Sequence, residues 1–266
     1  MRRRDFIKVV VGSTTAWPLA ARAQQMRRIG IVIALSEGDP ELKKWLEAFR
    51  EGLERLGWSE GRNVHFDYRF TPAGSRAGQL AKELLALEPD VILAFSTPVA
   101  AAFQRETHTV PVVFIGIADA ITQGFVRSLA HPEANLTGLT MYEASVSSKY
   151  LSMLKEIQPQ LTHTAFLVNP ATAPYYAVYM QGAKDAAPSL GVEVGLVPIK
   201  DDATDIEQAI ARFAHTSPKA GLVVVGDSTT NAHRDLIILA HSQVPPSGGI
   251  LEYIFCYRWR AHVLCG

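Results

Sequence analysis

Small hydroxyl side chains follow an apolar run of this sequence at the point where a loop and then a helix are expected. Ser96 and Thr97 stand directly before residues 99–105, which are expected to form a short helix. The first turn of a helix presents unpaired backbone N–H groups and the positive end of its dipole, which suit a carboxylate or another anion. The same hydroxyls also suit plain helix capping, and the two roles are compatible.

Acidic and aromatic side chains occupy comparable places further along the chain. Asp119 and Asp227 stand at matching strand ends, where either carboxylate suits a ligand ammonium or the cap of the next helix; Asp227 is the stronger candidate. Tyr175 suits stacking on an apolar or aromatic ligand, or packing at the start of a helix. The candidate ligand-binding residues are Ser36, Ser96, Thr97, Asp119, Asn169, Tyr175 and Asp227.

Motifs for catalysis or for metal binding are missing from the sequence. It has no nucleophile elbow, no Walker loop, no glycine-rich dinucleotide motif and no H-E-x-x-H. The eight histidines are scattered without the spacing of metal ligands. Asp201 and Asp202 open a predicted helix, where carboxylates favour the dipole rather than acid–base chemistry. We therefore expect no catalytic residues, no cofactor and no metal. An enzyme on the same scaffold would need a base or a phosphate loop.

Apolar runs of strand length alternate with amphipathic segments along the chain. Residues 28–35 form one such run, and residues 40–56 then place a stripe of apolar side chains on one helical face, with Asp39 as its cap and Gly57 as its stop. Further strands are expected at 63–70, 90–95, 110–115, 163–168, 192–199 and 220–226, and further helices at 76–87, 99–105, 145–157, 174–190 and 205–214. The alternation predicts an α/β fold with mostly parallel sheets.

The second half of the chain repeats the plan of the first half. Residues 83–98 and 212–229 match in type and order, which predicts two doubly wound parallel-sheet lobes. The lobes are expected at residues 24–141 and 142–245, joined near residues 136–143. Ligands of open parallel sheets bind beyond the carboxyl ends of the strands, so the candidate residues should line a cleft between the lobes.

The first residues indicate export. An arginine cluster precedes an apolar stretch, residues 9–20, which is shorter than the roughly 20 residues that span a bilayer core. Ala21-Arg22-Ala23 is a small-x-small cleavage site, so residues 1–23 are predicted to be a signal peptide removed near Ala23. The adjacent arginines resemble a twin-arginine (Tat) signal, and an ordinary Sec signal is the alternative.

The overall composition argues against nucleic-acid and acidic-membrane partners. Basic and acidic side chains balance at 26 each, and 48% of residues are hydrophobic, as in an ordinary globular protein. The two cysteines, Cys256 and Cys265, both lie near the end of the sequence, so a disulfide framework is not expected.

Several short segments together resemble one known family. They are A-R-A-Q after the leader, R-I-G-I-V-I, F-R-E-G-L-E-R-L-G-W at 49–58, G-R-N-V at 61–64, P-D-V-I-L-A at 89–94, N-L-T-G-L-T at 135–140 and N-P at 169–170. They are similar to the ABC transporter substrate-binding proteins related to tryptophan/tyrosine-binding receptors, which have the type I periplasmic-binding fold. The resemblance extends from the leader to about residue 234.

The resemblance implies a function in solute uptake. It implies that the chain binds a small organic solute between the lobes and delivers it to an ABC permease in the inner membrane, and the aromatic amino acids bound by some relatives suggest an amino-acid-like solute. It thus implies a periplasmic, monomeric receptor without catalytic activity. Family-like cleft positions would be Ser96, Thr97, Asp119, Asn169 and Asp227. An exported sensor for a membrane signalling partner is the alternative on the same fold.

The end of the sequence departs from the family pattern. Residues 246–266 show no clear period, whereas the family continues with elements that complete both lobes and the hinge. Codons chosen for residues 256–266 and shifted by one base encode a family-like segment, which suggests a frameshift. We therefore expect an aberrant tail at 246–266 with an incomplete second lobe and hinge, and a non-functional truncated product is a further alternative.

Overall fold

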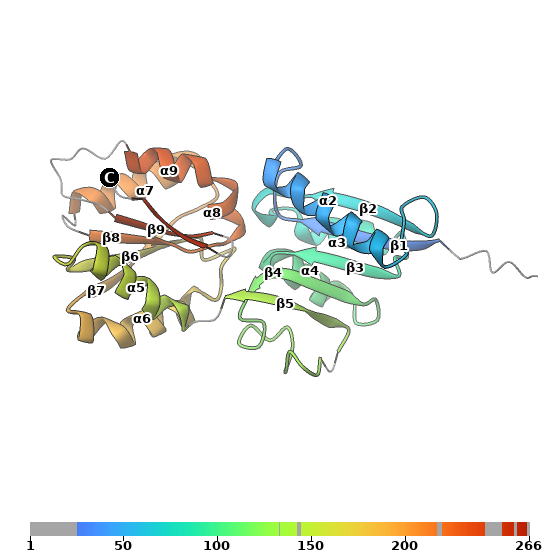
Figure 1. Cartoon of the computed structure of the whole chain (residues 1–266), viewed down its shortest axis with the longest axis horizontal. Helices are drawn as coiled ribbons and strands as arrows, with labels where there is room; N and C mark the ends of the chain where they lie inside the picture. Colours follow the sequence, from blue (N-terminus) through green and yellow to red (C-terminus); the bar gives the residue numbers. More distant parts are fainter. Residues whose placement is uncertain are drawn as a thin grey trace, which may run out of the picture.

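Five parallel strands form the first sheet of the computed structural model, which describes residues 26–132, 134–142, 145–216, 220–242, 252–257 and 260–264. The strand order is β2-β1-β3-β4-β5, and Figure 1 shows this lobe on the right. The strands are β1 (Arg27–Ile33), β2 (Val64–Phe70), β3 (Val91–Phe95), β4 (Val112–Ala118) and β5 (Leu136–Tyr142).

Helices cover the two faces of the first sheet unequally. Helices α3 (Ala77–Leu85) and α4 (Thr97–Glu106) pack together on one face, and of the described helices only α2 (Pro40–Arg55) packs on the other. The prediction for the ends of α2 is confirmed: the Asp39 carboxylate accepts from the N–H groups of Glu41 and Leu42, and Gly57 follows with φ of 88°. A short 3-10 turn, η1 (Pro72–Gly74), follows β2.

The second sheet also has five strands, in the order β10-β9-β8-β6-β7. They are β6 (His163–Val168), β7 (Glu193–Pro198), β8 (Ala220–Val224), β9 (Glu252–Tyr257) and β10 (Arg260–Leu264), all parallel except β10. Helices α5 (Val146–Ile157) and α6 (Tyr176–Leu190) cover one face, and α7 (Ala203–Thr216) and α9 (Arg234–Ser242) cover the other; α8 (Ser228–Ala232) is a single turn after β8.

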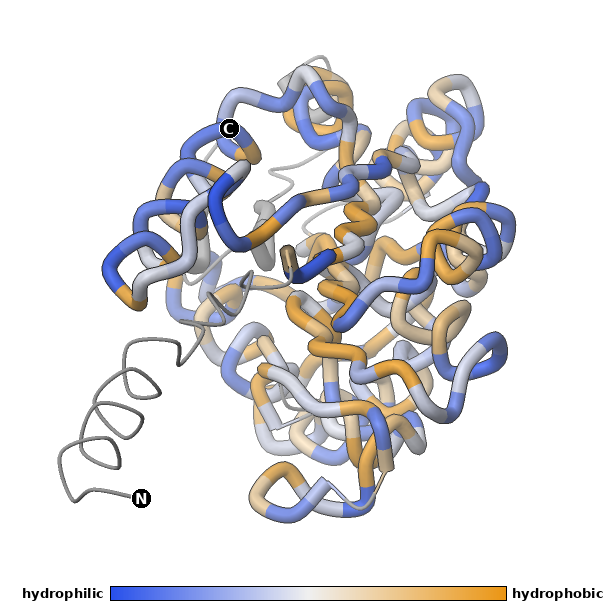
Figure 2. Tube along the Cα trace, turned by 90° about the vertical axis from the view of Figure 1, so that its right-hand side faces the viewer, coloured by the Kyte–Doolittle hydropathy of each residue, from blue (hydrophilic) through white to orange (hydrophobic). Residues whose placement is uncertain are grey.

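Hydrophobic residues concentrate in the interior of the molecule, and hydrophilic residues concentrate on its outer segments (Figure 2). The predicted α/β fold class with two parallel-sheet lobes is therefore confirmed. Strand β5 ends the first sheet at Tyr142, and α5 begins the second lobe at Val146. Among the described residues, no helix combines the length and the apolar character needed to cross a membrane.

The end of the sequence differs from the expected aperiodic tail. Residues 252–257 and 260–264 form the strands β9 and β10, and β9 pairs with β8. Tyr253, Ile254 and Phe255 are residue types that favour strands, and β8 offers the edge with which this segment pairs. The predicted signal peptide at 1–23 lies outside the described residues, and the incomplete second lobe and hinge remain a prediction.

Candidate functional site

A cavity of about 300 Å³ lies between the two lobes, and residues of both lobes line it. It adjoins the ends of β1, β3 and β8, where open parallel sheets bind their ligands. Its volume is at the lower end of the range for small-molecule sites, which fits a compact solute with a single ring system.

The first lobe supplies an apolar wall. Trp45 and Phe49 project from α2 toward the sheet, and the Trp45 ring lies 5.7 Å from the ring of Phe95 on β3. Ile115 of β4 is the register neighbour of Phe95, and it also lines the cavity. These side chains offer area for burying an aromatic or aliphatic group, and they offer no charge.

Ser96 lies where the apolar wall meets the first turn of α4. Its backbone has φ of 97° and ψ of 158°, a region that is essentially reserved for glycine, so holding a serine there stores strain. Its side chain is buried, and its Oγ has no hydrogen-bond partner. Thr97 begins α4, and Pro98 follows it. Because no side chain caps this helix, its first backbone N–H groups remain suited to an anion.

The second lobe supplies the polar wall. Tyr175, Asp227, Ser228 and Asn231 line the cavity from the segment before α6 and from α8. The Tyr175 hydroxyl donates to the Gly226 carbonyl at 2.8 Å, which fixes the ring beside α8. The wall therefore combines one aromatic face with several polar groups.

A buried hydrogen-bond network holds this wall in place. Asp227 Oδ1 accepts from the N–H groups of Thr229 and Thr230 at 2.6 and 3.0 Å, and from the Thr172 hydroxyl at 3.0 Å. Asp227 thereby caps α8, while its Oδ2 has only a 3.5 Å contact with the N–H of Asn169. Burial raises the pKa of Asp227 to about 6, although the hydrogen bonds from Thr230 and Thr172 oppose the shift.

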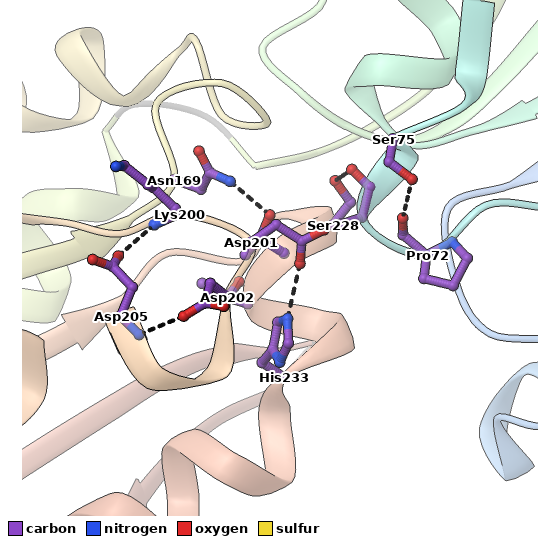
Figure 3. Close-up of polar contacts among 12 residues, drawn as sticks. Pro72, Ser75, Asn169, Lys200, Asp201, Asp202, Asp205, Ser228 and His233 are labelled. Atoms are coloured by element: carbon purple, nitrogen blue, oxygen red, sulfur yellow. Dashed lines mark hydrogen bonds and ion pairs between the residues drawn. The ribbon is translucent and has the colours of Figure 1, made fainter. Parts of the chain in front are cut away.

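The two lobes touch at one side of the cavity. The Ser228 hydroxyl donates to the Ala73 carbonyl of η1 at 3.2 Å, and Figure 3 shows Ser228 facing the turn that contains Pro72 and Ser75. A Cβ placed on Gly74 would lie 2.8 Å from Pro98 and 3.9 Å from the Ser228 hydroxyl. The starts of α4 and α8 therefore converge over η1.

Acidic residues at the start of α7 form a separate polar cluster. Asp202 Oδ1 accepts from the N–H of Asp205 at 2.8 Å, and a ring nitrogen of His233 lies 2.8 Å from Asp201 (Figure 3). Asp202 thus caps the helix, in agreement with the sequence analysis.

The structure brings together four of the seven predicted ligand-binding residues. Ser96, Thr97, Tyr175 and Asp227 line the cavity. The other three lie outside its lining: Ser36 is exposed, the Asp119 carboxylate accepts from the N–H of Thr122, and Asn169 donates to Thr229 behind the wall.

Other lining residues were not among the predicted ones. Trp45 and Phe49 belong to a helical apolar stripe, which indicates packing and carries no sign of a cavity. Asn231 lies four residues after Asp227 on the same face of α8, and that spacing is the signal that would have found it.

Comparison with known proteins gives one family and several similar folds. Residues 28–245 match the model of the family described as ABC transporter substrate binding protein. A curated relative, a tyrosine-binding protein of Clostridioides difficile, is 26% identical over 148 residues, which are 55% of this chain and 42% of the relative. The chain therefore matches less than half the length of that relative.

Solved structures of similar fold cover most of the chain. A conserved domain protein from Vibrio cholerae has a TM-score of 0.73 at 23% identity, with 87% of this chain and 79% of that chain covered. An ABC domain from Streptococcus pneumonia in complex with L-Trp has a TM-score of 0.70 at 18% identity, with 88% and 80% covered. At these identities the likeness establishes the fold alone.

Proposed function

Because the chain belongs to the ABC transporter substrate-binding protein family, we propose that it binds a small amino-acid-like solute with an aromatic side chain between its two lobes. The observation that carries the proposal is the cavity itself, in which an apolar wall with aromatic rings meets the open start of α4. A carboxylate bound at α4 would leave the side chain of the solute against Trp45 and Phe95.

The known relatives support an aromatic amino acid. One relative is a tyrosine-binding protein, and one similar structure holds L-Trp. We propose further that the protein is exported to the periplasm, with cleavage near Ala23, and delivers its solute to the permease of an ABC importer. It acts as a monomeric receptor without catalysis, and closure of the lobes would present the loaded form to the membrane.

Thermal unfolding with added solutes tests the proposal. The full chain is produced with its own first residues, and the purified protein is heated with tryptophan, tyrosine, phenylalanine, leucine, glutamate or ribose. A solute at 100 times its Kd adds about 2.7 kcal/mol to the free energy of unfolding, which raises Tm by roughly 5–10 °C. We expect this shift with an aromatic amino acid and none with glutamate or ribose. A shift with ribose alone, or with no amino acid, would overturn the proposal.

A matched pair of tryptophan variants locates the bound solute. Trp45 lines the cavity, whereas Trp58 is 37% exposed and lies outside the lining. Trp45→Ala should weaken binding at least tenfold, and Trp58→Ala should leave the Kd unchanged.

The mass of protein recovered from the periplasm tests export, since cleavage after Ala23 leaves a chain that begins at Gln24.

A further inference from the structure

The apolar wall of the cavity continues beyond the cavity on the first sheet. Phe95, Ile115 and Leu139 are register partners on β3, β4 and β5, so their side chains project from one face of the sheet, with neighbouring strands about 4.8 Å apart. We call this row the apolar strip. Phe95 and Ile115 line the cavity, whereas Leu139 lies outside its lining and is 67% exposed. The strip therefore begins inside the cavity and ends at solvent.

Leu139 borders the cavity from a second direction as well. Met141 lines the cavity and stands two residues after Leu139 on β5, so both side chains project from the same face of the strand, about 7 Å apart along it. Leu139 thus has one lining residue beside it on β4 and another on its own strand. Its exposed surface is continuous with the cavity, unlike that of an apolar side chain scattered singly over a protein surface.

The other end of this row is closed. Ile33 of β1 is the register partner of Phe95, and it is 3% exposed. Of the described helices, α2 packs on this face, and its Trp45 ring lies 5.7 Å from the ring of Phe95. A solute ring held against Trp45 and Phe95 can therefore be extended along the row in one direction, over Ile115 toward Leu139.

The apolar strip also restricts the chemistry of such an extension. The side chains of Ile115, Leu139 and Met141 carry no charge and no N–H or O–H group, so a polar extension would lose hydrogen bonds to water without replacing them. An apolar extension would instead remove its own surface and part of the Leu139 surface from water. The strip thus suits an apolar group.

We propose that the bound solute extends along the apolar strip, and that the receptor therefore prefers aromatic amino acids that carry a further apolar group at the far end of the ring. The inference rests on the proposed function and deepens it by naming the class of side chain. Leu139 determines this preference, because it contacts the added group and lies outside the cavity that holds the ring.

Pairs of ligands that differ only in the added group test the preference. The probes are L-tyrosine with its O-benzyl ether and L-tryptophan with its 5-benzyloxy derivative, measured by titration calorimetry at pH 7 on the full-chain protein. Each CH₂ group removed from water contributes roughly fourfold in affinity, and the ordering of the added group offsets part of this gain. In at least one pair, the extended ligand should bind at least tenfold more tightly than its parent.

Two leucine variants locate the added group. Leu139→Thr keeps a residue type that favours strands, and it should reduce the ratio of the two Kd values in that pair from at least ten to about two. Leu196 of β7 is the matched control, because it is also an exposed leucine of an edge strand, at 37% exposure, and belongs to the second lobe. Leu196→Thr should leave the ratio unchanged.

Three outcomes would overturn the inference. Weaker binding of both extended ligands than of their parents would mean that the cavity is closed toward β5, and an unchanged ratio in Leu139→Thr would place the added group elsewhere. A sedimentation mass of two chains that falls to one chain in Leu139→Thr would mean that a second copy covers the strip. The first two outcomes leave the proposed function standing, whereas failure of both parents and both extended ligands to bind would overturn the proposed function itself.

Discussion

The two lobes share one strand order, and they differ in how their sheets are covered. Counted from β2 and from β7, both sheets follow the pattern second, first, third, fourth, fifth strand. In the second lobe two helices cover each face, whereas in the described part of the chain α2 is the one helix on one face of the first sheet. One row of that face is Ile33, Phe95, Ile115 and Leu139, and exposure along it rises from 3% at Ile33 to 67% at Leu139.

The difference between the lobes coincides with their roles in the cavity. The incompletely covered face supplies the apolar wall, and the fully covered lobe supplies the wall fixed by a hydrogen-bond network. Among the described residues, the apolar side chains of Trp45, Phe95 and Ile115 line the cavity on the face that carries one helix. In the described part of the chain, the first lobe thus presents apolar surface to the cavity, and the second lobe presents polar groups that hydrogen bonds hold in place.

Deletion of one phenylalanine ring in each lobe gives the largest expected effect. Phe166 is fully buried on β6, and Phe95 is partly exposed in the cavity wall. Phe166→Ala should lower the free energy of unfolding by about 4 kcal/mol, and Phe95→Ala by about 2 kcal/mol, because a side chain open to the cavity leaves a smaller void. Denaturant unfolding measures both changes. Equal losses would mean that the two lobes are packed alike.

The buried Asp227 carboxylate of the second lobe should make the free energy of unfolding depend on pH. The pKa of Asp227 is about 6 in the folded protein and about 3.9 in an unfolded chain, so the folded state binds the proton more tightly. The free energy of unfolding should therefore fall as pH rises from about 3 to about 7, by about 3 kcal/mol in total, and by about 2 kcal/mol of this between pH 4 and pH 6.

Asp227→Asn removes this titration and should flatten the pH profile between 4 and 6. The exposed Asp185→Asn serves as the control, because its carboxylate lies on the outer face of α6 and should leave the profile intact. Persistence of the full slope in Asp227→Asn would assign the titration to another group.

Ser96 of the first lobe should lower the stability of the protein through its strained backbone and raise its affinity for the solute through its hydroxyl. Ser96→Gly removes the backbone strain that a serine has at φ of 97°. After the entropic cost of glycine is subtracted, the free energy of unfolding should rise by about 1 kcal/mol. The same variant loses the hydroxyl, so affinity for the solute should fall roughly tenfold. Ser96→Ala keeps the strain and should lose affinity without gaining stability. A destabilised Ser96→Gly protein would show that the backbone there is unstrained.

The strands and helices of both lobes can be predicted from local sequence patterns. Alternating apolar runs gave the strands, and Asp39 and Gly57 gave the ends of α2. Ser96 and Asp227 were accessible to prediction because polar residues directly after a buried strand must lie at the carboxyl edge of the sheet.

The cavity wall was not predictable from the same signals. Trp45 and Phe49 repeat at helical spacing, as core residues do, and only the width of the sheet left uncovered beside α2 makes them a binding surface. Ser36 and Asp119 follow strands as well, yet neither side chain belongs to the cavity lining. That outcome depends on how the two lobes face each other, which is a long-range property.

The exposed edge strand of the first lobe gives the smallest expected effect. Leu139 is 67% exposed beside Ile115, whereas Leu167 of the second lobe is fully buried. Leu139→Thr keeps a strand-forming residue and should change the free energy of unfolding by less than about 0.5 kcal/mol, while Leu167→Thr should cost about 3 kcal/mol or more. Denaturant unfolding of the two variants compares the open face with a covered one. A loss above about 1 kcal/mol in Leu139→Thr would mean that this face is covered in solution, and the contrast between the lobes would then no longer hold.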